Sequence, residues 1–192
     1  MTDGNHALEV TSSRIVYENK WMTLREDEIV RSSGARGIYG VVEKPPFAVI
    51  VPIDAEGNLH LVEQYRHPIG RRSLEVPQGS WERADVAVEV LAQAELREET
   101  GLIAGTLEMI GRLHLAPGFC TQTYDVFLAT DLTPGPTSLD PEEEGLMVVS
   151  VAFSDVFRLI ADGTITDATT VAAIALCTQE VATPQCMASA VT

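Results

Sequence analysis

The segment AELREETGL, which runs from Ala94 to Leu102, constrains the fold of this chain more than any other segment. It ends a stretch that contains no glycine or proline from residue 86 to residue 100 and is rich in Ala, Leu and Glu, so the sequence predicts a helix here. Gly101 is the residue type that commonly follows the last turn of a helix. We therefore predict a helix with Asp85 as its N-cap and Gly101 just beyond its end.

Three acidic side chains near the end of this helix share one face, because they are three or four residues apart: Glu95, Glu98 and Glu99. The C-terminal end of a helix carries partial negative charge, which costs an acidic side chain about 0.3–1 kcal/mol, and like charges at this spacing repel each other as well. The same face carries apolar residues one to two turns earlier, namely Val88, Leu91 and Ala92. The sequence therefore predicts that the glutamates continue a face that packs on the core.

A group of carboxylates without His or Cys selects hard divalent cations, Mg²⁺ first and Mn²⁺ next. A solvated acidic helix end is the alternative interpretation, and we favour the metal because the stripe of glutamates continues an inward face. A magnesium ion held by few protein ligands usually serves phosphates, and it lowers the pKa of a bound water. Hydrolysis of a diphosphate link is the reaction that this chemistry suits.

Composition excludes several other classes of protein. The formal net charge of −15 argues against nucleic acid as a partner, because phosphate binding needs a basic surface. The chain has no apolar run of the length that crosses a bilayer and no signal peptide at its start, so we expect no membrane segment and a cytoplasmic protein. Cys120, Cys177 and Cys186 form no CxxC pattern and are expected to be buried thiols.

The pattern along the chain predicts one folded unit of the α/β class with mixed sheets. Residues 14–30 are expected to form a β-hairpin, and the apolar run from Phe47 to Ile53 is expected to pair with the strand that starts at Leu59. Two helices are predicted near the C-terminus, the second capped by Asp167 or a nearby threonine. We expect an N-terminal β-extension over residues 1–44, a catalytic domain over residues 45–183 and a flexible tail over residues 184–192.

The segment PQGSWE, from Pro77 to Glu82, followed by AELREETGL resembles the Nudix box. The flanking segments LVEQYRHPIG, LEVPQG, LAPGF and DGTITDATTVAAIAL are similar to those of ADP-ribose pyrophosphatases, so the resemblance extends from about Arg14 to about Leu176. It implies a Nudix-fold α/β/α sandwich and hydrolysis of the diphosphate bond of a nucleoside diphosphate sugar. The substrate that it favours is ADP-ribose, giving AMP and ribose 5-phosphate.

The resemblance also implies roles for individual residues. The metal ligands would be the glutamates named above, Glu95, Glu98 and Glu99, together with the main-chain carbonyl of Gln78. In the acidic segment SLDPEEEG, either Glu142 or Glu144 would act as the general base. Substrate phosphates would contact Arg66, with Arg71 and Arg72 as further candidates and Glu75 orienting one of these arginines.

Two features depart from the family pattern. Ala94 stands where the Nudix box has an arginine, and the spacing from Gly79 to Glu95 is one residue longer than the pattern. We expect these changes to affect rate and metal geometry more than the fold. They leave open a non-catalytic Nudix module that binds nucleotides, and a hydrolase for GDP-mannose, a nucleoside triphosphate or a dinucleoside polyphosphate. The resemblance further implies a homodimer formed through the N-terminal extension.

Overall fold

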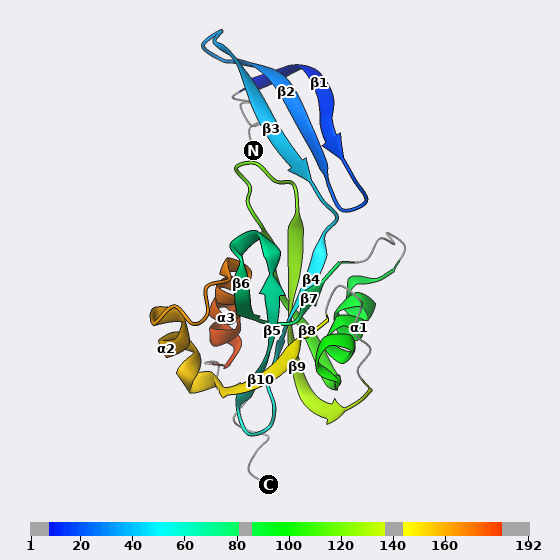
Figure 1. Ribbon diagram of the computed structural model, residues 1–192, viewed down its shortest axis with the longest axis vertical. Helices are drawn as coiled ribbons and strands as arrows, with labels where there is room; N and C mark the ends of the chain where they lie inside the picture. The colour runs from blue at the N-terminus through cyan, green and yellow to red at the C-terminus, as the bar shows by residue number, and fades with distance from the viewer. Residues whose placement is uncertain (1–7, 81–85, 137–143, 182–192) are drawn as a thin grey trace. The chain divides into compact units, whose positions relative to one another are not determined.

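The computed structural model describes residues 8–80, 86–136 and 144–181, with the side chains of residues 179–181 excepted (Figure 1). The chain divides into two compact units. The first contains the residues up to Pro46 together with His114–Thr123, and the second contains Phe47–Leu113 and the residues from Tyr124 onward. The sequence pattern did not predict that residues 114–123 belong to the first unit.

The first unit is built on a three-stranded antiparallel sheet of order β1-β2-β3. Its strands are β1 (Leu8–Glu18), β2 (Thr23–Arg31) and β3 (Arg36–Glu43). At the β1–β2 turn, the side-chain Oδ1 of Asn19 accepts hydrogen bonds from the backbone N–H groups of Trp21 and Met22, at 2.8 and 2.9 Å. This turn confirms the hairpin predicted for residues 14–30.

Backbone hydrogen bonds attach the 114–123 segment to β3. The N–H of Val42 donates to the carbonyl of Phe119 at 2.7 Å, and the N–H of Thr121 donates to the carbonyl of Val42 at 3.0 Å. The phenol of Tyr39 also donates to the carbonyl of Gly118 at 2.7 Å. The segment therefore extends the first unit although it follows β8 in the chain.

The second unit contains a four-stranded sheet of order β7-β4-β9-β8 and a three-stranded sheet of order β10-β5-β6 (Figure 1). The strands are β4 (Phe47–Pro52), β5 (Asn58–Arg66), β6 (Arg71–Glu75), β7 (Gln78–Gly79), β8 (Leu102–His114), β9 (Thr123–Pro134) and β10 (Met147–Ala152). Strand β4 pairs parallel with β9 and antiparallel with β7, so the first of these sheets is mixed, as predicted.

Helices cover the sheets on both sides. They are α1 (Val88–Thr100), α2 (Val156–Ala161) and α3 (Ala168–Val181), with short 3₁₀ segments at His67–Ile69 and Phe153–Asp155. In Figure 1, α1 lies on one side of the strands, and α2 and α3 lie on the other. Both α1 and α3 contact β4. The second unit is therefore the predicted α/β/α sandwich. None of the described helices has the length and apolarity that a membrane crossing requires.

Strand β4 separates two apolar clusters because successive side chains point to opposite faces of a sheet. Val49 and Val51 pack on one side with residues that include Leu61 and Ile174, and Ile50 packs on the other side with α1. On that second side, α1 contributes the predicted inward residues Leu91 and Ala92, which are buried, and Val88, which is partly buried. Cys120 and Cys177 are buried, as expected, and Cys186 lies outside the described residues.

One strand pairing predicted from sequence is wrong. The runs that begin at Phe47 and Leu59 lie in different sheets, and in the described residues their strand pairing is limited to an isolated bridge between Ile53 and Leu59. Strand β4 is buried at all six positions, and its two edges are taken by β7 and β9, which are distant in sequence. Neighbouring strands in sequence usually pair, but two interior strands separated by a short turn can also enter stacked sheets.

The C-terminal end of α1 agrees with the sequence prediction, whereas a different residue from the predicted one occupies the N-cap position. Gly101 follows the helix with φ of 70°, and its N–H donates to the carbonyl of Arg97 at 2.8 Å, which confirms the predicted C-terminal glycine. The N-cap position is Ala87, whose side chain makes no capping bond. Asp85, the predicted cap, lies outside the described residues.

Candidate active site

Two of the three glutamates of α1 point into the protein. Glu95 and Glu99 are 9% and 2% exposed, because they continue the buried stripe that starts at Leu91. Glu98 is partly exposed and accepts a hydrogen bond from Nη2 of Arg97 at 2.9 Å. The helix end therefore presents a buried pair of carboxylates with a third carboxylate at its rim.

The backbone of β7 packs directly against this pair. A Cβ atom placed on Gly79 would lie 2.3 Å from the carboxylate carbon and oxygens of Glu95, so a larger residue here would require the Glu95 carboxylate to move. One residue earlier, the backbone N–H of Gln78 donates to Oε2 of Glu99 at 3.2 Å. The long-range contact between β7 and α1 thus brings a strand backbone and two carboxylates together.

The oxygen atoms at this helix end are suitable ligands for a hard divalent cation that keeps part of its water shell. Glu95 and Glu99 supply carboxylate oxygens, which is the oxygen chemistry that Mg²⁺ takes, and Gln78, whose main-chain carbonyl the family resemblance adds to the set, lies beside Glu99. Among the residues that the structure describes, no three His, Cys, Asp or Glu side chains are grouped closely enough to hold a metal ion. Oxygen atoms of water or substrate would therefore complete the metal site, because the described protein side chains alone do not surround an ion.

A cavity of about 440 Å³ lies beside this region, over β5, β6 and the start of α3. Its charged lining residues include Arg66 on β5, Arg71 and Glu75 on β6, and Asp167 just before α3. Residues 71, 73 and 75 line one face because side chains alternate along a strand, and the pairing of Arg66 with Arg71 puts these two on the same face. The cavity therefore combines guanidinium and carboxylate groups.

Arg66 and Glu75 form a two-pronged ion pair. Nε of Arg66 donates to Oε1 of Glu75 at 3.0 Å, and Nη2 donates to Oε2 at 2.6 Å. Burial opposes the charge on Glu75, but the hydrogen bonds and charge of Arg66, together with hydrogen bonds from Ser73 and Gln78, outweigh burial and hold the pKa of this carboxyl below its ordinary value. Burial likewise opposes the charge on Arg66, yet Glu75, Glu99 and Asp167 together raise its pKa. Both groups are charged near neutral pH.

Gln78 connects the cavity to the buried carboxylates. Its side-chain Nε2 donates to Oε2 of Glu75 at 2.7 Å, while its backbone N–H binds Glu99. A single residue therefore joins the arginine-bearing cavity to the carboxylate pair of α1. The sequence marked Gln78 only for its main-chain carbonyl, and its side chain carried no signal for this second contact.

The two arginines of β6 have different surroundings. Arg71 lines the cavity, and its Nη2 donates to Oγ1 of Thr166 at 2.7 Å. Arg72 points to the other face, where Nε donates to Oε2 of Glu63 at 3.0 Å and Nη2 donates to the carbonyl of Gly145 at 3.0 Å. Arg71 therefore lies beside Arg66 in the cavity, whereas Arg72 is hydrogen-bonded to the turn before β10.

Of the two candidates for general base, Glu144 is the one that lies among the described residues. Glu144 lies exposed in a turn next to Gly145, whose φ is 82°. Glu142 lies outside the described residues. The choice between the two stays a prediction. Sequence reasoning missed Asp167 and Thr166 as cavity residues, although the first was singled out as a helix cap.

Comparison with known proteins assigns the chain to a class. A family model described as the NUDIX domain matches residues 43–173, and one described as the nucleoside diphosphate sugar hydrolase N-terminal domain matches residues 9–42. The chain therefore belongs to the Nudix hydrolase family, as the resemblance of its glutamate-rich helix indicated.

Particular relatives narrow the comparison. The chain is 32% identical over 170 residues to the ADP-ribose pyrophosphatase of Mycobacterium tuberculosis, covering 88% of this chain and 82% of that protein. It is 30% identical over 161 residues to the ADP-ribose pyrophosphatase of Bacillus subtilis, covering 83% of this chain and 86% of that protein. A crystal structure of an ADP compounds hydrolase superposes with a TM-score of 0.82 at 23% identity, covering 94% of this chain and 97% of that one, which shows the shared fold.

Proposed function

We propose that this Nudix hydrolase cleaves the diphosphate bond of ADP-ribose and releases AMP and ribose 5-phosphate. The observation that carries the proposal is the double contact of Gln78, which joins the Arg66–Glu75 cavity to Glu99 of α1. The relatives in Mycobacterium tuberculosis and Bacillus subtilis, both named ADP-ribose pyrophosphatase, support the choice of substrate. A diphosphate held in the cavity would lie beside the carboxylates that serve its hydrolysis.

In this proposal Arg66 and Arg71 bind the diphosphate, since a guanidinium offers a planar set of donors that matches phosphate oxygens. Glu75 keeps Arg66 charged and oriented, because its two oxygens occupy one edge of the guanidinium and leave the other donors for the substrate. Arg72 acts indirectly by holding the carbonyl of Gly145, next to Glu144. Glu142 or Glu144 accepts the proton of the attacking water.

Nudix hydrolases generally need a divalent metal ion, and we propose Mg²⁺, with Mn²⁺ as a substitute. Glu95, Glu99 and the carbonyl of Gln78 would hold it, and Glu98 would join them after leaving Arg97. That exchange costs little, because an exposed ion pair stabilises a protein by only about 0–1 kcal/mol. When bound, the ion would neutralise charge on the diphosphate and lower the pKa of a bound water.

The test is turnover by Glu99→Gln against a panel of substrates: ADP-ribose, GDP-mannose, ATP and a diadenosine polyphosphate, each with Mg²⁺. We expect ADP-ribose to be the best substrate and the variant to lose at least about 100-fold in turnover, with an unchanged melting temperature. Glu89→Gln is the matched control, since Glu89 lies exposed on the same helix. Wild-type turnover in Glu99→Gln would exclude the mechanism, and preference for another compound would exclude the substrate.

A second candidate is a Nudix module that binds nucleotide without hydrolysing it, which Ala94 and the longer spacing between Gly79 and Glu95 favour. The burial of both Glu95 and Glu99 against β7 opposes it, because a site without function would not need two buried carboxylates. Calorimetry with ADP-ribose and Mg²⁺, followed by chromatography of the same sample, separates the two candidates. Binding without AMP would establish the module.

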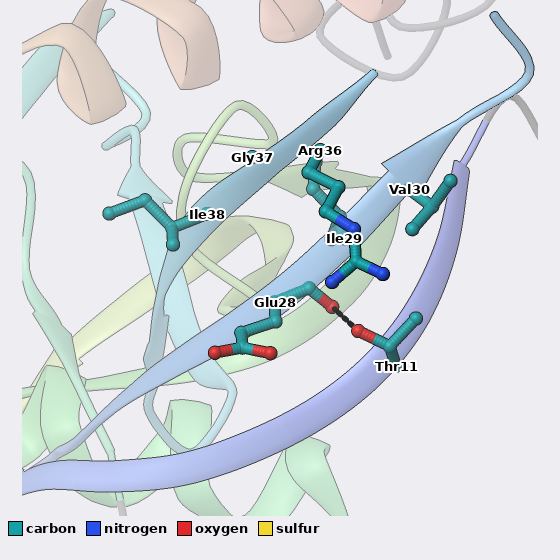
Figure 2. A pocket seen from close by; sticks show the side chains of 7 residues that line it. All are labelled: Thr11, Glu28, Ile29, Val30, Arg36, Gly37 and Ile38. Atoms are coloured by element: carbon teal, nitrogen blue, oxygen red, sulfur yellow. Dashed lines mark hydrogen bonds between the residues drawn. The ribbon is translucent and has the colours of Figure 1, made fainter. Parts of the chain in front are cut away.

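We also propose that two copies associate through the N-terminal sheet. Strand β1 is exposed at every position, and Ile15 and Ile38 are 60% and 65% exposed. A hollow of about 310 Å³ lies on this sheet. Figure 2 shows the residues that line it, namely Thr11, Glu28, Ile29, Val30, Arg36, Gly37 and Ile38. Exposed apolar side chains on a free sheet are typical of an interface. A monomeric mass by light scattering would contradict this proposal.

A cytoplasmic location is part of the same proposal. The buried Cys120 is a free thiol, which is the usual state of cysteine in a reducing compartment. Cell fractionation with an antibody to the chain would test the location, and recovery in the membrane or secreted fraction would contradict it.

A further inference from the structure

The short segment between β6 and β7 joins two groups of the proposed active site. Glu75 ends β6 and holds Arg66, whereas Gln78 begins β7 and binds Glu99. Val76 and Pro77 lie between them and belong to neither strand. Because proline has no N–H, Val76 supplies the only backbone donor of this connection, and Val76 is fully buried. A buried N–H must find an acceptor, and that acceptor determines where the segment lies.

The acceptor is a side chain of α3. The N–H of Val76 donates to Oγ1 of Thr170 at 3.1 Å, across 94 residues of sequence. Thr170 is also fully buried. On the other side of the connection, the carbonyl of Pro77 accepts a hydrogen bond from the N–H of Ile50 on β4 at 2.9 Å. The segment is thus held between the central strand of the sheet and the first turn of α3.

Asp167 fixes the hydroxyl of Thr170 in turn. Oγ1 of Thr170 donates to Oδ2 of Asp167 at 2.8 Å, and the backbone N–H of Thr170 donates to the same oxygen at 2.7 Å. The carbonyl of Asp167 accepts the first helical hydrogen bond of α3, from Val171 at 3.0 Å. Asp167 is therefore the N-cap of this helix, and its side chain directs the Thr170 hydroxyl proton away from Val76, which leaves a lone pair for the Val76 N–H.

We propose that Thr170 is a positioning residue for the reaction: its hydroxyl sets the backbone at Val76 and thereby the placement of the Glu75–Arg66 pair that receives the diphosphate. The kinetic part of this inference rests on the proposed function, whereas the contact between Thr170 and Val76 does not. Loss of the hydroxyl leaves the Val76 N–H without its acceptor, so the segment shifts and carries Glu75 with it. A displacement of about 1 Å at a group that binds substrate can cost on the order of 100-fold in rate.

The test compares three variants with the wild type. Thr170→Val keeps the shape and removes the hydroxyl, and Thr170→Ser keeps the hydroxyl. Thr169→Val is the matched control, because Thr169 is the adjacent buried residue of α3 and is not the acceptor of the Val76 N–H. The measurements are kcat and KM for ADP-ribose with saturating Mg²⁺, the melting temperature, and hydrogen exchange of the Val76 amide.

We expect Thr170→Val to lower kcat/KM by about tenfold, mainly through a higher KM, because Arg66 acts in binding. Thr170→Ser and Thr169→Val should stay within about twofold of the wild type. In a Glu75→Gln background, Thr170→Val should add less than about twofold, since both changes act through one group. Three results would each overturn the proposal. They are wild-type kinetics in Thr170→Val, a loss of kcat/KM in Thr170→Ser as large as in Thr170→Val, and losses of kcat/KM from Thr170→Val and Glu75→Gln that add in full in the double variant.

Hydrogen exchange tests the contact without any turnover. The wild-type Val76 amide should exchange slowly, and the same amide should exchange faster in Thr170→Val. Fast exchange of Val76 in the wild type would overturn the proposal, even if Thr170→Val does not fold. If the wild type does not hydrolyse ADP-ribose but Val76 is protected by Thr170, the proposed function fails while the structural contact stands.

Discussion

Strands β4 and β1 both carry aliphatic residues, yet they differ completely in burial. All six residues of β4 are buried, whereas all eleven residues of β1 are exposed. Strand β4 lies between β7 and β9 and contacts helices α1 and α3, so both of its edges and both of its faces are covered. Strand β1 is the edge of a three-stranded sheet.

This difference indicates where each unit obtains its stability. In the second unit, apolar side chains on both faces of β4 stabilise the scaffold that carries the cavity and the carboxylate pair. In the first unit, β1 buries little apolar area within one chain, and turn hydrogen bonds and strand pairing contribute a larger share. The exposed apolar residues of β1 are then available to a second copy of the chain.

The largest expected effect is on the core around β4. Ile50→Ala should lower the free energy of unfolding by about 3 kcal/mol, because the lost methyl groups leave a cavity between the sheet and α1. Urea denaturation followed by circular dichroism measures this loss. A decrease of less than about 1 kcal/mol would show that β4 is not the main source of stability.

The next effect concerns the ion pair of the cavity. Glu75→Gln should cost about 2 kcal/mol at pH 7, because it removes the charge that compensates the partly buried Arg66. The folded-state pKa of Glu75 is lowered from its ordinary value of 4.5, so the contribution is complete above that pH and is lost as the pH falls through the lowered pKa.

The measurement for this ion pair is the melting temperature of the wild type and Glu75→Gln between pH 7 and pH 3. The gap between the two proteins should be widest near neutral pH and should narrow below about pH 4.5. A gap that stays constant with pH would mean that the stabilisation does not come from the charge on Glu75.

A smaller effect is expected at the β1–β2 turn. Asn19→Ala removes the acceptor of two backbone hydrogen bonds, from Trp21 and Met22, and should cost about 1 kcal/mol in the first unit. Hydrogen exchange of the β1 and β2 amides would locate the loss. Faster exchange confined to the second unit would contradict the assignment of stability to this turn.

The smallest effect on the free energy of unfolding should come from β1 itself. Ile15→Ala is expected to change the stability of a single chain by less than about 0.5 kcal/mol, because Ile15 is mostly exposed. The same variant should weaken the proposed dimer, measured as a lower mass by light scattering at dilute protein. If Ile15→Ala destabilises a chain as much as Ile50→Ala, the contrast between the two strands is wrong.

Local features of this protein were predictable from sequence, because their causes lie within a few residues of each other. The helix that ends before Gly101, the inward direction of Glu95 and Glu99 and the cap at Asp167 each follow from spacing and residue type. The family resemblance added the α/β/α fold, which the structure and the comparisons confirm.

Only the tertiary structure decided which distant residues meet. It put β4 and β5 in different sheets, chose Arg71 over Arg72 for the cavity, and returned residues 114–123 to the first unit. It also brought Gln78 to both Glu75 and Glu99, and Thr170 to Val76. Such contacts depend on strand register and on which face of an element is buried against another, and no short window of sequence contains that information.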